Sequence, residues 1–567
     1  MVSGDMKRPT HLFSVALALA AGLAFGSHWC PAQSYTTTVL RKLGDSSPPP
    51  SATYTQILDN GPTLNNSGRV NFGVRLSTNN QAAIIGTGFI PDAILFRQES
   101  AAPDGNGTFV SFSQFGCNKA GASAFVGTLS GASPSDALKG AFVSLDSMVQ
   151  VIRGGQSIPG GPGTISAISA GTPVGGIATN SLGEIAGRVQ LQGTGSSTND
   201  VAIYRGNGGP LTEVVRKGQS PPGATTIVEL EAPSMNDLSE VAFLARFTGG
   251  TTYAYYVHDG TGLVEMARSG DALTGGGQIA DFDTTESPVN IEGNIAFAAR
   301  LVGTTNDRVL VHATDSNLTV IARKGTSAPG GGIFFDFSTT PVALNDSDEL
   351  AFQARVENPA GTGTLLDTLF TWDGDTLHRI AAKGVVAPGG SDQFSGFGNP
   401  AINADGDVVF FASLFGTSDT GLFIYNASTG TLGQVIRTFT PFAGNELNSI
   451  NFLSLPHLGS PFNGFNDSGQ VAFRYRLTNG QTGIALCSPN PIPPAIITVE
   501  STEHTASEFT VTWSISNNAG VDVYRSSDLT AWGTPVSTNN IADTFTDSPR
   551  PAGTAFYALV PSGQSFP

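Results

Sequence analysis

Charged residues are scarce in this chain of 567 residues, because Asp, Glu, Lys and Arg make up only 13% of it, against about 25% in typical soluble proteins. The few charges are also unbalanced, with 45 acidic and 28 basic residues and a formal net charge of −17. This excess of negative charge argues against a nucleic-acid partner held through its phosphates. The apolar fraction of 40% suffices for a core and excludes general disorder.

Cysteine is rarer still, with Cys30, Cys117 and Cys487 as its three copies. Three cysteines do not form a disulfide scaffold, even in an oxidising compartment, so we expect the fold to be stabilised by packing. The sequence also lacks a Gly-x-Ser-x-Gly elbow, a phosphate-binding loop, a nucleotide fingerprint, and His-x-x-x-His or Cys-x-x-Cys pairs. We therefore expect no cofactor and no metal site.

Only one long apolar run is present, from Leu12 to Gly26, and it follows Lys7 and Arg8. At 15 residues it is shorter than the ~20 needed to span a bilayer, so it predicts a secretory signal peptide over residues 1–32, cleaved after Ala32. In a lipoprotein Cys30 would be lipidated, but the bulky residues before it disfavour this alternative. The prediction is an exported protein without a transmembrane segment in its mature chain, which is secreted, periplasmic or held at the cell surface.

Glycine, by contrast, is abundant, with 70 copies, and part of it belongs to a repeat. The pattern Asn-x-x-Gly-x-x-Ala-Phe-x-x-Arg-Leu is clearest from Asn466 to Leu477. Its copies start at Asn65, Asn118, Asn180, Asn236, Asn290, Asn345, Asn403 and Asn466, at spacings of 53 to 63 residues. Gly stands at the fourth position in six copies and Phe at the eighth in seven, with Gly187 as the exception. So regular a spacing indicates tandem structural units.

A second pattern lies between these copies, namely an apolar β-branched run followed by Arg and then usually by Gly and Pro. Its positions are Arg41, Arg97, Arg153, Arg216, Arg268, Arg323, Ala382 and Arg437. The Asn-x-x-Gly element favours a tight turn, and strand-length apolar runs follow it. Four short strands in about 56 residues have the size of a propeller blade. We therefore predict an all-β fold with an eight-bladed β-propeller over residues 33–488, or a seven-bladed one if the copy at Asn118 is not a blade.

The order of the two patterns predicts how the propeller closes. The chain after the signal peptide begins with an Arg-type strand, Tyr35 to Arg41, whereas the last Asn copy ends at Cys487 without one. Placing residues 35–41 as the last strand of the final blade completes eight blades and covers a sheet edge that would otherwise favour aggregation.

The C-terminal part has a different pattern. The Pro-rich stretch 489–494 is typical of a stiff linker. Residues 495–567 contain alternating strands such as Phe509 to Trp513 and Val521 to Tyr524, which favour a small fibronectin-like β-sandwich. We expect the whole chain to be a monomer.

The repeat, as in Asn466-x-x-Gly469-x-x-Ala472-Phe473, resembles that of the NxxGxxAF tandem-repeat family of large, exported bacterial proteins. The resemblance covers roughly residues 35–488. It implies export and a propeller-like repeat, and it implies no reaction and no site residues.

Several residue sets are candidates for chemistry. The recurrent arginines form either a ring that lines an anion-binding channel or, as we favour, one structural contact per blade; they are Arg75, Arg246, Arg300, Arg355 and Arg476. The Asn-Asp-x-Gly elements suit either calcium loops or, as favoured, plain β-turns. Two acid pairs, Asp281/Asp283 and Asp373/Asp375, could be the carboxylates of a glycosidase, and we interpret them as surface acids. The isolated His258, His312 and His378 could bind a metal or act as a base, and we interpret them as packing residues. Cys117 is likewise interpreted as a buried packing residue.

Two functions are compatible with these observations. The favoured hypothesis is a non-catalytic binding or scaffold protein at the cell exterior, which contacts glycans or envelope proteins, because the repeats are near-uniform and no unique chemical cluster stands out. The alternative is a propeller-type polysaccharide hydrolase or lyase with its site at the central channel. The sequence identifies no catalytic residue for it, so we leave the catalytic residues unassigned.

Overall fold

The structure is a computed structural model of the chain. It describes residues 17–19, 34–48, 52–59, 61–78, 81–87, 92–144, 147–168, 176–221, 223–250, 252–283, 287–337, 342–416, 419–454, 463–490, 497–504, 508–515, 521–526, 536–540, 544–548 and 556–561. The chain divides into two compact units. The larger comprises Tyr35–Tyr425 and Gln434–Pro489, and the smaller comprises Met1–Ser34, Asn426–Gly433 and Asn490–Pro567.

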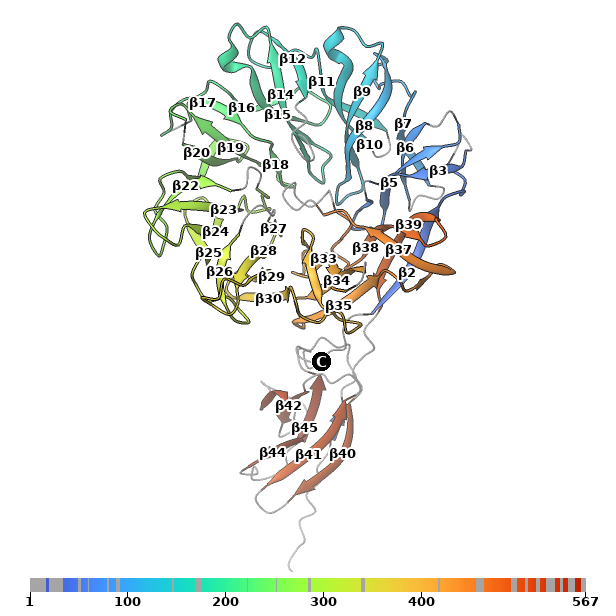
Figure 1. Cartoon of the computed structure of the whole chain (residues 1–567), viewed down its shortest axis with the longest axis vertical. Helices are drawn as coiled ribbons and strands as arrows, with labels where there is room; N and C mark the ends of the chain where they lie inside the picture. The colour runs from blue at the N-terminus through green and yellow to red at the C-terminus, as the bar shows by residue number, and fades with distance from the viewer. Residues whose placement is uncertain are drawn as a thin grey trace, which may run out of the picture. The chain divides into compact units, whose positions relative to one another are not determined.

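The larger unit is all β-structure, and its sheets follow one another in chain order around a common centre (Figure 1). Among the described residues there are eight such sheets, each of four or five strands, as in a β-propeller. The first three sheets contain β3 (Tyr54–Ile57), β4 (Thr63–Leu64), β5 (Val70–Leu76), β6 (Ala82–Gly86) and β7 (Ala93–Arg97); β8 (Thr108–Cys117), β9 (Ser123–Ser130), β10 (Lys139–Ser144) and β11 (Met148–Arg153); and β12 (Thr164–Ile168), β13 (Ile177–Thr179), β14 (Ile185–Gln192), β15 (Val201–Gly206) and β16 (Thr212–Arg216). Two short 3₁₀ helices, η1 (Ser135–Leu138) and η2 (Ser197–Asn199), lie in loops of the second and third sheets.

The next four sheets repeat this plan of a short first strand, which is often split in two, and three longer ones. They contain β17 (Ile227–Leu230), β18 (Ser234–Met235), β19 (Val241–Phe247), β20 (Tyr253–His258) and β21 (Leu263–Arg268); β22 (Gln278–Phe282), β23 (Ile295–Val302), β24 (Arg308–Ala313) and β25 (Leu318–Arg323); β26 (Ile333–Asp336), β27 (Ala343–Leu344), β28 (Leu350–Glu357), β29 (Leu365–Trp372) and β30 (Leu377–Ala382); and β31 (Phe394–Phe397), β32 (Ala401–Ile402), β33 (Val408–Leu414), β34 (Thr420–Asn426) and β35 (Thr431–Arg437).

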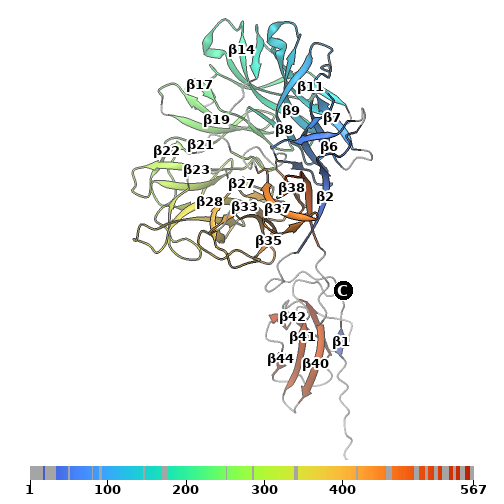
Figure 2. The same cartoon turned by 45° about the vertical axis from the view of Figure 1, so that its right-hand side comes forward.

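The last sheet combines the two ends of the larger unit. Its strands are β36 (Pro441–Phe442), β37 (Asn445–Asn451), β38 (Val471–Leu477), β39 (Thr482–Pro489) and β2 (Tyr35–Lys42). Strand β2 pairs antiparallel with β39 from Tyr35 opposite Pro489 to Lys42 opposite Gly483 (Figure 1). Figure 2 shows β2 beside β37 and β38 of the same sheet. The strand predicted from the Arg pattern at residues 35–41 is therefore the neighbour of the last strand of the last repeat.

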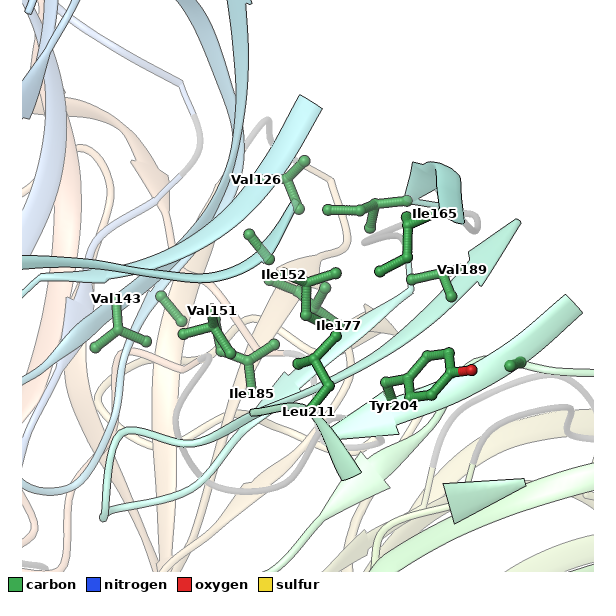
Figure 3. Packing of buried hydrophobic residues seen from close by; sticks show 14 of the residues in the cluster. Val126, Val143, Val151, Ile152, Ile165, Ile177, Ile185, Val189, Tyr204 and Leu211 are labelled. Carbon is green, nitrogen blue, oxygen red and sulfur yellow. The ribbon is translucent and has the colours of Figure 1, made fainter. Parts of the chain in front are cut away.

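Apolar side chains pack between consecutive sheets. The phenylalanine of the eighth motif position is at most 2% exposed in every repeat that has one, which places it in the core: Phe72, Phe125, Phe243, Phe297, Phe352, Phe410 and Phe473. Between the second and third sheets Val126, Ile152, Ile165 and Val189 belong to one cluster with Tyr204 (Figure 3). Each interface of this kind buries the facing sides of two neighbouring sheets, which is the main source of stability in such a fold.

Among its described residues, the smaller unit contains two sheets. One consists of β40 (Ile497–His504), β41 (Phe509–Ile515) and β44 (Thr544–Asp547), and the other of β42 (Val521–Ser526), β43 (Ser537–Asn540), β45 (Phe556–Pro561) and β1 (Leu17–Leu19). Phe509, Trp513, Val523 and Tyr557 share one apolar cluster.

Two predicted segments lie largely outside the described residues. Of the predicted signal peptide, 1–32, only β1 is described, and it pairs parallel with β45. Of the predicted linker, 489–494, Pro489 ends β39 and residues 491–494 are outside the described part. In the part of the chain that the structure describes, no helix has the length and apolar character needed to cross a membrane.

Candidate functional site

The eight repeat asparagines build the turns that precede the long second strand of each sheet. In the turn at Asn466, Oδ1 accepts hydrogen bonds from the backbone N–H groups of Ser468 and Gln470 at 3.1 and 2.9 Å. The same two bonds, to the second and fourth following residues, recur in six other repeats, and Asn118 bonds the third and fourth instead. This is an Asx-type turn, in which the side chain replaces a backbone acceptor. The favoured β-turn interpretation of these elements therefore accounts for the asparagine.

The fourth residue of each turn has a positive φ, including the two that are not glycine. Ser239 has φ +67° and Asp348 has φ +63°, close to the +69° of Gly469. L-residues rarely adopt this conformation, and for this reason glycine predominates at the position. The exceptions mark turns where the side chain makes contacts of its own, as Asp348 does with Asn290 and His312, at 2.7 and 2.9 Å.

The asparagine side chains also connect one repeat to the next. Nδ2 of Asn290 donates to the carbonyl oxygen of Asn345, and Nδ2 of Asn345 donates to that of Asn403, at 3.3 and 2.9 Å. Equivalent bonds run from Asn118 to Asn180, from Asn236 to Asn290 and from Asn466 to Asn65. Because all these asparagines are buried, the bonds are formed away from competing water and hold the turns in register around the centre.

The second residue of each turn lies at the centre of this arrangement. These residues are, in order, Asn66, Lys119, Ser181, Asp237, Ile291, Asp346, Ala404 and Asp467. Lys119 of the second repeat extends to the sixth and eighth, where its Nζ lies 3.2 Å from Oδ2 of Asp346 and 3.9 Å from Oδ2 of Asp467. The ammonium group therefore joins repeats that are four and six apart in the chain.

Each of the three carboxylates is oriented by the repeat before it. Oδ1 of Asp237 accepts from the backbone N–H of Ser181 at 2.7 Å. Asp346 accepts in the same way from Ile291 at 3.0 Å, and Asp467 from Ala404 at 3.0 Å. Every second repeat thus supplies an acceptor for its predecessor, and Lys119 occupies the corresponding place in the one remaining even-numbered repeat.

The electrostatics of this cluster favour the charged lysine. Burial lowers the pKa of Lys119, but Asp346, Asp467 and Asp237 outweigh it, so that the pKa of the ammonium group is raised from its ordinary value. The lysine is held protonated and engaged, which is the state of a structural counter-ion rather than that of a general base.

Residues of all eight repeats line the cavity around Lys119, whose volume is about 70 Å³. A cavity needs about 10–15 Å³ of such space to hold one water molecule, so this one has room for several waters. Lys119, Asp346 and Asp467 in its lining are engaged with one another or with the preceding turns.

The recurrent arginines are placed separately in their own sheets. Arg246, Arg300 and Arg355 each pair across the strands with an acid of the first strand of the same sheet, respectively Glu229, Asp281 and Asp336. Arg75 and Arg476 stand opposite neutral residues in the same register, respectively Gln56 and Ser449. In three of the five positions the acid partner agrees with the favoured interpretation, in which each arginine makes one structural contact in its own blade.

The second set of arginines lies at the ends of the outer strands and contacts neighbouring loops. Arg153 donates from Nε to the carbonyl of Ala137 at 2.7 Å, and Arg323 donates to that of Gly276 at 2.7 Å. Arg437 pairs with Asp419 at 2.6 Å. These arginines satisfy carbonyl and carboxylate groups of loops at the junctions of the sheets.

The remaining candidates are dispersed. Asp281 and Asp283 lie beside the first strand of the fifth sheet, whereas Asp373 and Asp375 belong to the β29–β30 turn, where Oδ1 of Asp373 accepts from the backbone of Thr376 at 2.7 Å. The three histidines also have local partners: Nδ1 of His258 accepts from Gly260, His312 bonds Asp348 and His378 bonds Asp373. Within the described ranges, no group of three or more His, Cys, Asp or Glu residues is arranged to hold a metal ion.

Cys117 is fully buried, as predicted, and burial raises the pKa of its thiol to about 12. The thiolate is the reactive form of cysteine, so this side chain is an inert core residue.

Sequence reasoning missed Lys119. The available signal was the second turn position, which alternates between an acid and a neutral residue from the third repeat to the eighth, with one lysine in the second repeat. Nothing local in the sequence shows that this lysine extends across the centre.

Comparisons with known proteins show a family. Residues 24–197 and 174–495 match the profile of a family described as "Family of unknown function (DUF7453)". No curated protein matches the chain.

Similar solved structures include three β-sheet proteins of low sequence identity. The β-propeller domain of the Trilobed protease from Pyrococcus furiosus is 11% identical over 66% of this chain and 94% of its own, with a TM-score of 0.35. An oligogalacturonate lyase from Vibrio parahaemolyticus is 12% identical over 70% of this chain and 98% of its own, with a TM-score of 0.34. The SapL1 lectin, in complex with alpha methyl fucoside, is 13% identical over 58% and 97%, with a TM-score of 0.24. No fold, ligand or activity is transferred from these structures to the chain.

Proposed function

The chain belongs to the DUF7453 family, whose function is unknown, and from its own residues we propose that it is an exported, non-catalytic binding or scaffold protein that contacts glycans or envelope proteins. The proposal concerns the larger unit first, because the repeats and the Lys119 cluster lie there.

The proposal rests on how the charged residues around Lys119 are bonded to one another and to the neighbouring turns. A catalytic site needs a free acid, base or nucleophile beside space for the substrate. Here the lysine faces Asp346 and Asp467, the carboxylates are bonded to the preceding turns, and the cavity measures about 70 Å³. This arrangement suits a rigid platform whose ligands bind on the outside.

We further propose that the eight sheets form a closed, eight-bladed propeller in which β2 is the last strand of the eighth blade. Two observations support closure, namely the pairing of β2 with β39 and the bond from Asn466 to Asn65, which repeats the bond between consecutive turns. Closure leaves no unpaired edge between the first and last blades, which suits a protein that remains exposed outside the cell.

Export rests on the signal peptide predicted over residues 1–32, with the mature protein secreted, periplasmic or at the cell surface. We propose that residues 495–567 form a separate β-sandwich module joined through the Pro-rich segment 489–494. The two sheets that share Phe509, Trp513 and Tyr557 support this division. The net charge of −17 supports the absence of a nucleic-acid partner.

The test uses purified residues 33–567 with a panel of polysaccharides. Binding is measured by retention on the immobilised polysaccharide, and catalysis by new reducing ends over time. We expect no release of reducing ends from any substrate, with retention if the ligand is a glycan. Release from one polysaccharide would overturn the proposal in favour of a propeller-type hydrolase or lyase. Absence of retention, without release, would direct the search to a protein partner.

A further inference from the structure

The eight Asn turns form one surface of unusual composition, which we call the turn face. It consists of residues 65–69, 118–122, 180–184, 236–240, 290–294, 345–349, 403–407 and 466–470. These forty residues contain ten acids and two basic residues, Arg69 and Lys119. In a chain with only 45 acids in 567 residues, this is a local concentration of negative charge.

The third residue of every turn is its exposed tip. In five repeats the tip is Ser, Glu or Asp and in one it is Ala, but in the third and fourth repeats it is leucine. Leu182 is 71% exposed and Leu238 is 64% exposed, the two highest values among the large apolar side chains of the described residues. Single exposed leucines are ordinary on protein surfaces. Two in equivalent positions of neighbouring repeats are not a random scatter.

The two turns that carry the leucines are bonded to each other. Between their turns, the backbone N–H and the Oγ of Ser181 bond the two carboxylate oxygens of Asp237 at 2.7 and 2.8 Å. Within each turn the leucine N–H donates to the asparagine, with Leu182 bonded to Asn180 and Leu238 to Asn236, at 3.1 and 3.0 Å. The pair is therefore pre-organised, and a partner that contacts it orders little backbone on binding.

We propose that the turn face is a docking surface for a basic protein segment that carries apolar side chains. Apolar groups of the partner pack on Leu182 and Leu238, and its Lys or Arg residues face acids at other exposed tips of the turn face, such as Glu292 in the fifth repeat and Asp405 in the seventh. Charge complementarity selects this partner over an acidic polysaccharide or an anionic lipid surface, and the leucine pair selects it over a bare cation. The inference rests on the proposed non-catalytic function and names the class of its partner.

The test uses residues 33–567 and three 12-residue peptides, in which Lys alternates with Leu, Lys with Ser, or Glu with Leu. We expect the Lys–Leu peptide to bind, and binding to weaken as salt is raised from 50 to 150 mM, since exposed charges are screened. We expect the Lys–Ser peptide to bind at least tenfold more weakly and the Glu–Leu peptide not to bind.

Variants locate the surface. Leu182→Ser with Leu238→Ser should weaken binding of the Lys–Leu peptide about tenfold while leaving the weaker Lys–Ser binding unchanged. Glu292→Gln with Asp405→Asn should weaken both. The matched control is Val302→Ser, because Val302 is 53% exposed at the far end of β23, seven residues or about 23 Å along the strand from Ile295 next to a turn. This control should bind as the unchanged chain does.

Three results would overturn the docking surface: no binding of the Lys–Leu peptide at 100 µM, equal affinity of the double-leucine variant, or equal weakening by Val302→Ser. Displacement of the peptide by 2 mM Ca²⁺ from both the unchanged chain and the leucine variant would instead identify a cation site. Polysaccharide retention and reducing-end release, measured on the same variants, distinguish failure of the docking surface from failure of the proposed function. Unaltered glycan retention by the leucine variant, with no peptide binding, leaves the function standing without this surface.

Discussion

The side-chain amide of Asn466 in the last repeat donates a hydrogen bond to the backbone carbonyl of Asn65 in the first, with Nδ2 and the oxygen 2.9 Å apart. The same bond joins consecutive repeats, as from Asn345 to Asn403 at 2.9 Å. Residues 401 positions apart in the chain are thus related as neighbours are. Strand β2 lies beside β39 in the sheet of that last repeat. Its removal therefore tests whether the first and last repeats depend on each other.

Deletion of residues 33–42 should lower the melting temperature and expose Cys487. This thiol is fully buried, its Sγ lies 3.1 Å from Oγ1 of Thr37 in β2, and burial raises its pKa to about 12 despite that contact. Iodoacetamide at pH 8 should leave both thiols of the chain 33–567 unmodified and should alkylate only Cys487 in the deletion variant. Cys117, far from β2, is the internal control. An unchanged melting temperature with Cys487 still protected would contradict closure by β2.

Replacement of a core phenylalanine measures the packing between sheets. Phe297 is fully buried, with its ring centroid 5.3 Å from that of Tyr255 and 5.1 Å from that of Phe282. Phe297→Ala should reduce the free energy of unfolding by about 3–5 kcal/mol, as expected for truncation of a buried aromatic side chain. Val302→Ala, at an exposed position of the same strand, should change it by less than about 0.5 kcal/mol. Urea denaturation measures both, and a loss below ~1 kcal/mol for Phe297→Ala would refute the core assignment.

The local features of the repeat could be predicted from the sequence because each has a local cause. Asn at the first position bonds its own turn, and Gly at the fourth supplies a positive φ, so both leave a signature in every copy. The absence of Phe at Gly187 also has a physical reason, since a Cβ there would lie 2.7 Å from Cδ1 of Ile152 on the preceding sheet. The neighbouring repeat fills that space, and one repeat viewed alone does not show it.

Contacts across the centre could not be predicted in this way. Lys119 and Asp346 are 227 residues apart, and their contact depends on the order and curvature of all the intervening sheets. The leucine pair was visible in the sequence at the third turn position, but its exposure depends on the turns being held on one face. The repeat pattern predicts the structure of a single repeat, whereas the candidate site depends on how the eight repeats are arranged around the centre.

Phe439 occupies a backbone position that suits glycine. Two residues after the last position of the outer strand, which is Arg or, once, Ala382, Gly155, Gly218, Gly270, Gly325 and Gly384 all have positive φ. Phe439 stands at this place after Arg437, with φ +56°, and is 43% exposed. Phe439→Gly should raise the free energy of unfolding by up to about 1 kcal/mol relative to Phe439→Ala, since both lose the ring and only glycine relieves the backbone. Thermal denaturation of the pair measures this difference. Greater stability of the alanine variant would show that the backbone here is unstrained.

Lys119→Met tests whether the lysine is the counter-ion of the carboxylate cluster. Its removal leaves Asp237, Asp346 and Asp467 facing one another without a cation, so stability should fall by about 1–3 kcal/mol, between the values for exposed and buried ion pairs. Millimolar Ca²⁺, an oxygen-seeking cation, should restore part of the loss in the variant and leave the unchanged chain unaffected. Asp104→Asn, which removes one acid away from the cluster, is the control for a general effect of Ca²⁺ on an acidic protein.

The difference in stability between the unchanged chain and Lys119→Met should depend on pH, because the pKa of Lys119 is raised. A lysine whose pKa is higher in the folded than in the unfolded chain stabilises fully below the unfolded value of about 10.4, and this contribution is lost as pH rises through the folded value. The stability difference between the unchanged chain and Lys119→Met should therefore stay constant from pH 7 to pH 10 and shrink above that range. Urea midpoints at intervals of half a pH unit measure it. A difference that grows with alkaline pH would show that the carboxylates do not hold the proton on this lysine.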